Sequence, residues 1–204
     1  MRFFTGLLLM AAYALCQTVS PFTAVEVSRQ YDAAGKLTAE SRFLFAMNRD
    51  GSIASVELDP GAAHIRQIID VVKHRTIVVD SASRSAIGLG YRASPRQPVD
   101  ACESRFNSIV DATVGVDRLA GTVNGIAVER VSVHLPDRSV MQAFLAPSLG
   151  CHMLRTVIER DGLALETHIS ERLLLGDPDP RMFEVPADYH LTVASLTPRV
   201  QFHH

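Results

Sequence analysis

The sequence predicts a mainly β domain in which consecutive antiparallel strands form one curved sheet. Three dipeptides that favour two-residue hairpin loops, Asp50-Gly51, Asn124-Gly125 and Asp161-Gly162, each stand between β-type runs. The DAAGK stretch at 32–36 and Pro136-Asp137 indicate two more turns. Between the turns, apolar and polar residues alternate, as in strands that turn one face to a core. We therefore expect five hairpins that form a meander around a single core.

The apolar positions of three predicted strands each fall on one face. These positions are Phe43, Phe45 and Met47, then Val131, Val133 and Leu135, then Leu163, Leu165, Thr167 and Ile169. Such faces fill the core of a meander. A curved sheet that stays open can instead leave an apolar groove, and Met and Phe side chains suit ligands of variable shape. Phe43, Phe45 and Met47 are therefore candidate groove residues, with a filled core as the alternative.

One helix is expected between the two strand-rich parts of the chain. Asp100 and Glu103 form a capping-box pattern, and Gly115 is placed to end the helix. Between them, apolar residues recur at helical spacing: Phe106, Ile109, Val110 and Val114. The pattern predicts a helix that packs over the sheet.

Residues 1–16 are identified as a signal peptide. One arginine precedes an apolar run from Phe3 to Leu15, which is too short to span a bilayer as a permanent helix. Ala14 and Cys16 suit the small-residue positions of a signal peptidase site, so residues 17–204 should form a single soluble domain. A lipid anchor at Cys16 is the alternative. Because no other apolar run approaches membrane length, we expect no integral membrane segment in the mature chain.

Two cysteines remain after cleavage, Cys102 in the first turn of the predicted helix and Cys151 on a predicted strand. An even pair in an exported chain indicates a disulfide. Closing a loop of about 50 residues would stabilise the fold by about 4 kcal/mol and would pin the helix to the sheet. Two buried free thiols are the alternative.

Charge and motifs exclude several classes of function. The formal charge is −2 and the basic residues are scattered, so the chain has no basic stripe for nucleic acid. The sequence contains no G-x-S-x-G, H-E-x-x-H, P-loop or C-x-x-C motif. We therefore expect no catalysis and no cofactor.

Two polar stripes are the strongest candidates for chemistry. One alternates along a predicted strand as Glu166, His168, Ser170 and Arg172, and the other as Arg130, Ser132 and His134. Alternate residues project from the same face, so either stripe can bind a polar head group or exchange protons. The water-facing side of an antiparallel sheet has the same composition, and we interpret both stripes as solvated.

No metal site is predicted. Asp177 and Asp179 in GDPDP fit turn chemistry better than a calcium loop, which needs more oxygen ligands at regular spacing. His152 beside Cys151 lacks a second ligand pair at zinc-finger spacing. The final pair, His203 and His204, is expected at a frayed terminus.

The order of these elements and the closing phrase PRMFEVPADY resemble exported bacterial proteins of the LolA-like superfamily. The likeness covers most of the mature chain, and its specific part is the closing phrase. It implies that Met182 to Val185 form a short closing strand and that Pro186 ends this strand. It also implies that Asp188 and Tyr189 lie in a turn against the end of the barrel.

The resemblance implies an unclosed, curved antiparallel β-barrel, or half-barrel, with a covering helix. In well-known members of the superfamily the apolar cavity takes lipoprotein acyl chains, and related domains are sensors that bind a partner protein in the periplasm. We therefore expect a non-catalytic periplasmic protein that binds a lipid or an acylated protein. The alternative is a periplasmic protein-interaction or sensor module without a small-molecule ligand.

Overall fold

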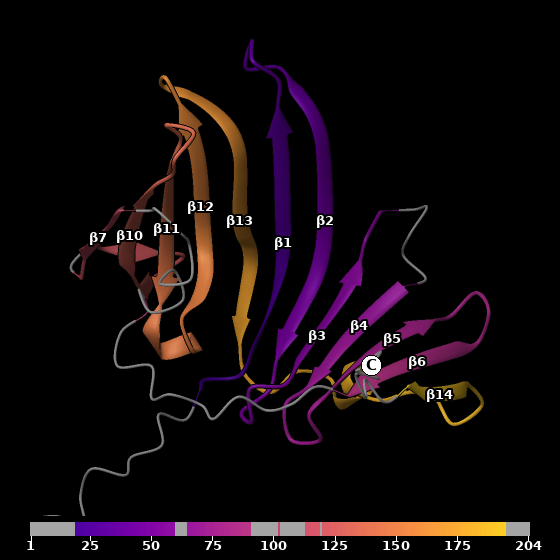
Figure 1. The fold of residues 1–204 in the computed structure, drawn as a ribbon. Helices are drawn as coiled ribbons and strands as arrows, with labels where there is room; N and C mark the ends of the chain where they lie inside the picture. Colours follow the sequence, from indigo (N-terminus) through magenta and orange to yellow (C-terminus); the bar gives the residue numbers. More distant parts are fainter. Residues whose placement is uncertain (1–18, 60–64, 91–101, 103–112, 119, 195–204) are drawn as a thin grey trace, which may run out of the picture.

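The computed structural model describes residues 19–59, 65–90, 102, 113–118 and 120–194. Twelve strands form one sheet in the order β14-β6-β5-β4-β3-β2-β1-β13-β12-β11-β10-β7, and its two end strands do not pair with each other. Neighbouring strands are antiparallel except β14 and β6, which are parallel. Figure 1 shows the sheet opening widely between its two ends. The predicted mainly β, unclosed and curved sheet is confirmed.

The sheet draws its strands from both halves of the chain. The first half contributes β1 (Phe22–Tyr31), β2 (Leu37–Met47), β3 (Ile53–Glu57), β4 (Ile65–Asp70), β5 (Arg75–Asp80) and β6 (Ser85–Gly90). The second half contributes β7 (Thr113–Asp117), β10 (Glu129–His134), β11 (Val140–Ala146), β12 (His152–Arg160), β13 (Leu163–Leu175) and β14 (His190–Ala194). Outside the sheet, the described residues include the hairpin of β8 (Thr122–Val123) and β9 (Ile126–Ala127) and the 3₁₀ helices η2 (Pro147–Leu149) and η3 (Pro180–Phe183).

All five predicted turns are confirmed. Residues 32–36 join β1 to β2, Asp50-Gly51 joins β2 to β3, and Pro136-Asp137 joins β10 to β11. Asn124-Gly125 joins β8 to β9, and Asp161-Gly162 joins β12 to β13. In both of these dipeptides each residue has a positive φ, between 51° and 79°. Two successive positive φ values match the twist of the flanking strands, which explains the Asn-Gly and Asp-Gly sequences.

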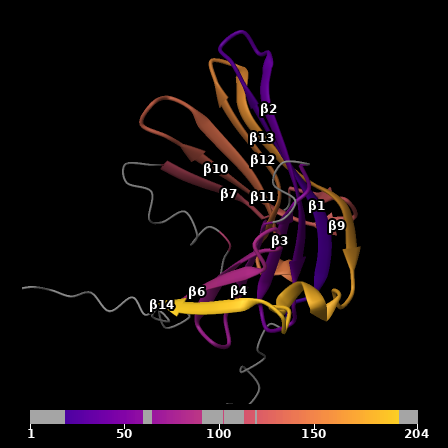
Figure 2. The same ribbon diagram turned by 90° about the vertical axis from the view of Figure 1, so that its right-hand side faces the viewer.

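The sheet has two distinct faces, because residues that pair directly across neighbouring strands project to the same side. Ala24 on β1 pairs with Phe45 on β2, and their side defines what we call the concave face. Ala46 on β2 pairs with Ala54 on β3 on the other side, the convex face. Figure 2 shows the long hairpins rising away from β4 and β6, and the concave face lies between these two parts of the sheet.

The buried apolar residues form three clusters. The first, at the start of β1, contains Phe22, Ala24, Met47, Val128, Ala146, Leu149 and Leu154. The second, around the disulfide, contains Cys102, Val131, Val133, Ala143, Leu145 and Cys151. The third contains Ile68, Ile77, Val79 and Ala86, and it lies on the convex face because Ala54 pairs with Ile68 and Ile68 with Ile77. The predicted core role of Val131 and Val133 is therefore confirmed.

The closing phrase of the sequence covers the third cluster, but not as a strand. The closing strand predicted for Met182 to Val185 is wrong, because η3 occupies Pro180–Phe183. Asp179 accepts a hydrogen bond from the Arg181 backbone N–H, and proline at the first helical position favours the 3₁₀ turn. The predicted turn that contains Tyr189 is confirmed by its 3.0 Å backbone bond to Pro186, and Val185 and Tyr189 pack on the third cluster.

Cys102 and Cys151 form the predicted disulfide, with their Cα atoms 5.4 Å apart. Cys151 was expected on a strand, but it lies in the bend before β12. The predicted helix does not reach Gly115, because Val114 and Gly115 belong to β7, where Val114 pairs with Val133. Sheet pairing therefore overrides the helical spacing at this end.

The other predicted parts of the helix, the signal peptide of residues 1–16 and the pair His203 and His204 lie outside the described residues. The described residues contain 3₁₀ turns but no α-helix, so the covering helix is not shown. No helix in this part of the chain combines the length and the apolarity needed to cross a membrane.

Candidate functional site

A buried carboxylate lies at the centre of the concave face. Glu26 belongs to β1, where it pairs with Phe43 on β2 and with Ser170 on β13. Its side chain is only 6% exposed. Because a buried charge is costly unless it is fully hydrogen-bonded, the partners of Glu26 determine whether it can remain ionised here.

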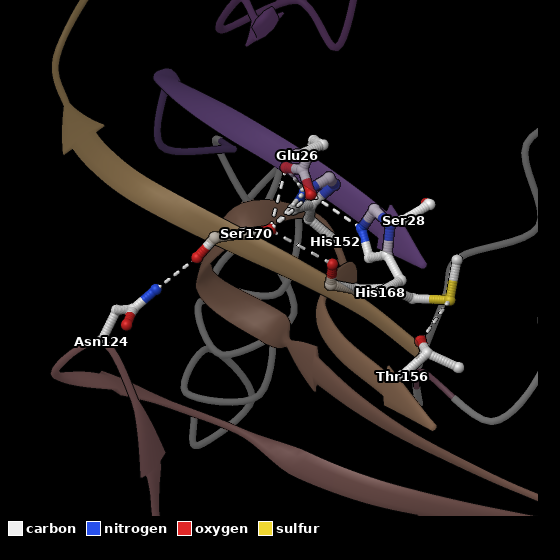
Figure 3. A network of polar contacts seen from close by, with 8 residues as sticks. Glu26, Ser28, Asn124, His152, Thr156, His168 and Ser170 are labelled. Carbon is white, nitrogen blue, oxygen red and sulfur yellow. Dashed lines mark hydrogen bonds and ion pairs between the residues drawn. The ribbon is translucent and has the colours of Figure 1, made fainter. Parts of the chain in front are cut away.

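Three side chains from two other strands surround this carboxylate (Figure 3). His152 places Nε2 3.0 Å from Oε1 of Glu26, and His168 places Nε2 2.7 Å from Oε2. The Ser170 hydroxyl donates to both carboxylate oxygens at 2.8 Å. Strands β1, β12 and β13 are therefore joined at one point by charge-assisted hydrogen bonds. We call these four residues the Glu26 network.

The network keeps the carboxylate ionised. Burial raises the pKa of Glu26, but the hydrogen bonds from His152 and His168, together with the charges of these imidazoles, outweigh burial and lower the pKa from 4.5 to about 2. Glu26 is therefore an anion throughout the neutral and mildly acidic range.

The outer edge of the network is a serine. Ser28 follows Glu26 on the same face of β1, and it pairs with His168 on β13. The Ser28 hydroxyl lies 3.1 Å from Nδ1 of His168. Since Nε2 of the same imidazole contacts Glu26, one histidine connects the serine hydroxyl to the buried carboxylate.

Aromatic side chains enclose the inner edge of the network. The His152 ring lies 4.8 Å from the ring of Phe22 and 4.7 Å from that of Phe45. The two phenyl rings are themselves stacked, with centroids 5.7 Å apart. This packing limits the access of water to the His152 side of the carboxylate, while His168, which is 24% exposed, forms the open side.

The β8–β9 hairpin contributes one further contact. The Asn124 side-chain amide donates to the backbone carbonyl of Ser170 at 2.6 Å. The strand pairing of β12 and β13 runs only as far as Arg155 and Ile169, so this carbonyl lies beyond the paired region. The predicted Asn-Gly turn therefore also supports the strand that carries two members of the network.

The sequence-based interpretation of the polar stripe on β13 is wrong for part of the stripe. Ser170 is fully buried and His168 is mostly buried, whereas Glu166 is partly exposed and Arg172 is exposed. The face predicted to meet the core, with Leu163, Leu165, Thr167 and Ile169, lies on the opposite side of β13, and the prediction is wrong for Leu163, which is exposed. The sequence of β1 does contain a sign of this buried polar site. In FTAVEVS, Glu26 alternates with Phe22 and Ala24 and so shares their core-facing side.

The stripe of Arg130, Ser132 and His134 is solvated as predicted, because Arg130 and His134 are exposed and Ser132 is partly exposed. Asp177 lies in the predicted turn region and pairs with Arg49 at 2.9 and 3.0 Å. Within the described ranges, no group of three or more His, Cys, Asp or Glu side chains is arranged to hold a metal ion.

The three candidate groove residues lie on the concave face, next to the Glu26 network. Met47 is buried in the first cluster, and Phe45 packs against that cluster. Phe43 is partly buried and lies across from Glu26. Their role as the wall of a groove stays a prediction.

Comparison with known proteins adds information at the level of the fold. No family model and no curated protein matches the chain. An uncharacterized conserved protein from Thermus thermophilus is similar, with a TM-score of 0.51 over 87% of this chain and 93% of that protein, at 11% identity. MucB matches with a TM-score of 0.49 over 85% of this chain and 60% of MucB, at 16% identity.

The LolA superfamily protein NE2245 from Nitrosomonas europaea matches with a TM-score of 0.37, at 10% identity, over 82% of this chain and 90% of that protein. The solved structures that match therefore include a LolA superfamily protein. At these identities the likeness concerns the fold alone.

Proposed function

We propose that this chain is a periplasmic binding protein for an apolar or acylated ligand, such as a lipid or the acyl chain of a lipoprotein. The observation that carries the proposal is the exposure of apolar side chains on the concave face at β5 and β6. Val78, Ile87 and Leu89 project from this face and remain exposed, with Ile87 52% exposed. Exposed apolar residues that gather on one face favour a binding surface over a finished core.

Strand register places these residues on the same face as the aromatic candidates. Ile87 pairs with Val78, which pairs with Gln67 on β4. Gln67 pairs with Ser55, and Ser55 pairs with Phe45. An acyl chain that lies across the strands from Phe43 towards Ile87 would exchange water for apolar side chains at about 0.8 kcal/mol per buried CH₂ group. Ten such groups would contribute about 8 kcal/mol, which is the scale of micromolar affinity before the cost of ordering the chain.

The disulfide supports export as part of this proposal. Cys102 is 1% exposed and bonded to Cys151, and structural disulfides persist in oxidising compartments such as the periplasm. The apolar N-terminal run of residues 1–16 supplies the export signal that the proposal needs.

A fluorescent fatty-acyl probe tests the proposal directly. We expect saturable binding by the mature protein, displacement by long-chain lipids, and loss of binding in Ile87→Glu. Val193→Glu is the matched control, because Val193 is 61% exposed on the neighbouring strand but projects from the convex face, where it pairs with Gly88. Both substitutions place a charge at an exposed site, so circular dichroism should show an intact sheet in each. Equal binding by the wild type and Ile87→Glu would contradict the proposal.

A protein-interaction module is the second candidate, and the edge strand β14 favours it. In the described part of the chain, β14 pairs only with β6, and its sequence HLTVA has no lysine, acidic residue or proline to protect the edge. Leu191 and Val193 are exposed on this strand. A photocrosslinking residue at Val193 should then capture a partner strand in the periplasm, whereas the same residue at Leu37, at the far tip of the β1–β2 hairpin, should not.

A further inference from the structure

Ser28, His168 and Glu26 form a hydrogen-bonded line on the concave face. Ser28 and Glu26 alternate along β1, and the strand register places His168 directly across from Ser28. The Ser28 hydroxyl is 3.1 Å from Nδ1 of His168, and Nε2 of His168 is 2.7 Å from Oε2 of Glu26. A hydroxyl, an imidazole that contacts it and a carboxylate that orients the imidazole are the three parts of an activated serine nucleophile.

The protonation pattern follows from the carboxylate. An ionised carboxylate only accepts hydrogen bonds, so Nε2 of His168 must carry a proton and donate to Glu26. In the neutral imidazole, Nδ1 then has the free lone pair and accepts the proton of the Ser28 hydroxyl. His152 and Ser170 hold the carboxylate in place from the other side. The base is therefore oriented by a fixed anion.

Ser28 and Ser170 differ in their exposure to solvent. Ser170 is fully buried and directs its hydroxyl to Glu26, whereas Ser28 is partly exposed beside the 24% exposed His168. The titratable groups that face His168 are Glu26 on β1, His152 on β12 and Glu166, two residues away on the same face of β13. The facing residues of β2 are Ser41 and Phe43, and Glu57 of β3 lies beyond Phe43.

We propose that Ser28 is a base-activated nucleophile and a site of covalent acylation by activated esters or thioesters. The Ser28 oxygen attacks the acyl carbonyl carbon while Nδ1 of His168 takes the hydroxyl proton. The tetrahedral adduct collapses, the bond from carbon to the leaving oxygen or sulfur breaks, and the proton passes from His168 to the leaving group. The products are an acyl ester on Ser28 and a free alcohol or thiol. Glu26 acts through His168 as a positioning residue.

The inference goes beyond ligand binding and does not depend on it, because a small probe needs no acyl groove. The structure supplies a nucleophile, a base and an orienting anion. The expected readout is therefore a single covalent modification of Ser28, and repeated turnover of an ester is not required.

The test is reaction of the mature protein with an ethyl fluorophosphonate probe, followed by intact mass and peptide mapping. We expect one adduct, on Ser28, with a rate that rises with pH, because only the neutral imidazole of His168 can take the hydroxyl proton. Ser28→Ala should abolish the adduct, and His168→Gln should slow it by about 100-fold or more. Ser41→Ala is the matched control, because Ser41 pairs with Ser28 on the same face, and it should react like the wild type.

Two cysteine variants keep the test independent of folding, and Glu26→Gln tests the positioning role. Ser28→Cys should react with iodoacetamide faster than the same variant that also carries His168→Gln, with circular dichroism unchanged in both. Glu26→Gln should slow labelling and move the midpoint of its pH profile to lower pH, which a purely structural role would not do. No adduct on the folded wild type, an adduct at another residue, or equal rates with and without His168 would overturn the proposal.

Discussion

Glu26 should make the stability of the fold fall in acid. The decrease of its pKa from 4.5 to about 2 corresponds to about 3 kcal/mol of stabilisation, at about 1.4 kcal/mol per pKa unit. The carboxylate is almost completely buried, so solvent does little to screen these contacts. Because the pKa is lower in the folded state than in the unfolded state, the stabilisation is fully present above about pH 4.5 and is lost as the pH falls through about 2.

Urea unfolding of the wild type and of Glu26→Gln measures this contribution. The variant replaces an anion that accepts from His152, His168 and Ser170 with a neutral amide that also carries donors. At neutral pH the variant should therefore be less stable by about 3 kcal/mol or more. Between about pH 5 and 2 the difference in the free energy of unfolding should shrink by about 3 kcal/mol, because the wild type loses the stabilisation that the variant never had.

A second carboxylate provides the control. Glu166 projects from the same face of β13 and is partly exposed, so Glu166→Gln removes a charge without removing the buried anion. Its stability should follow that of the wild type across the whole pH range. If instead the curve of Glu26→Gln ran parallel to the wild-type curve from neutral pH to about pH 2, protonation of Glu26 would not be linked to unfolding.

Three other features can be tested by stability and mass. Replacing both Cys102 and Cys151 with serine should lower the free energy of unfolding by about 4 kcal/mol, since the bridge spans 49 residues, and non-reducing peptide mapping should recover the linked pair from the wild type. Arg66→Ala should cost about 2 kcal/mol in urea unfolding and expose η3 to proteolysis, because Arg66 donates to the carbonyls of Arg181 and Glu184. Arg49→Ala, which breaks only an exposed ion pair, should leave the free energy of unfolding nearly unchanged. The mass of the protein recovered from the periplasm should match a chain that begins near residue 15 or 17, and a lipid on Cys16 would contradict cleavage.

The local parts of the fold were predictable because short sequence signals specify them. Asn124-Gly125 and Asp161-Gly162 adopt the positive φ values that their turn type requires, so each hairpin follows from two residues. Elements whose geometry depends on distant partners were not predictable in this way. Val114 has helical spacing from Val110 but pairs with Val133 in the sheet. The closing phrase forms a 3₁₀ turn that Arg66 holds from β4, 115 residues before Arg181 in the chain.

The Glu26 network was not predictable from β13 alone, because that strand carries two alternating patterns. Glu166, His168 and Ser170 alternate on one face and Leu165, Thr167 and Ile169 on the other, and periodicity does not say which face meets the core. The pairing with β1 decides it, since Ser170 lies across from Glu26, and Glu26 shares its face with Phe22 and Ala24 of the first cluster.

The polar face of β13 can be buried because its polar groups are hydrogen-bonded to partners on other strands. The contact between Glu26 and His152 joins residues 126 positions apart, and that between Glu26 and Ser170 joins residues 144 apart. Had β13 paired one residue out of register, Leu165 and Ile169 would face the core and the anion of Glu26 would lose His168 and Ser170. A buried charge that has lost two of its three partners costs several kcal/mol, and this cost opposes the gain from burying two more aliphatic residues. The network therefore fixes the register of the central strands, and the same register sets Ser28 against His168 at the open side of the concave face.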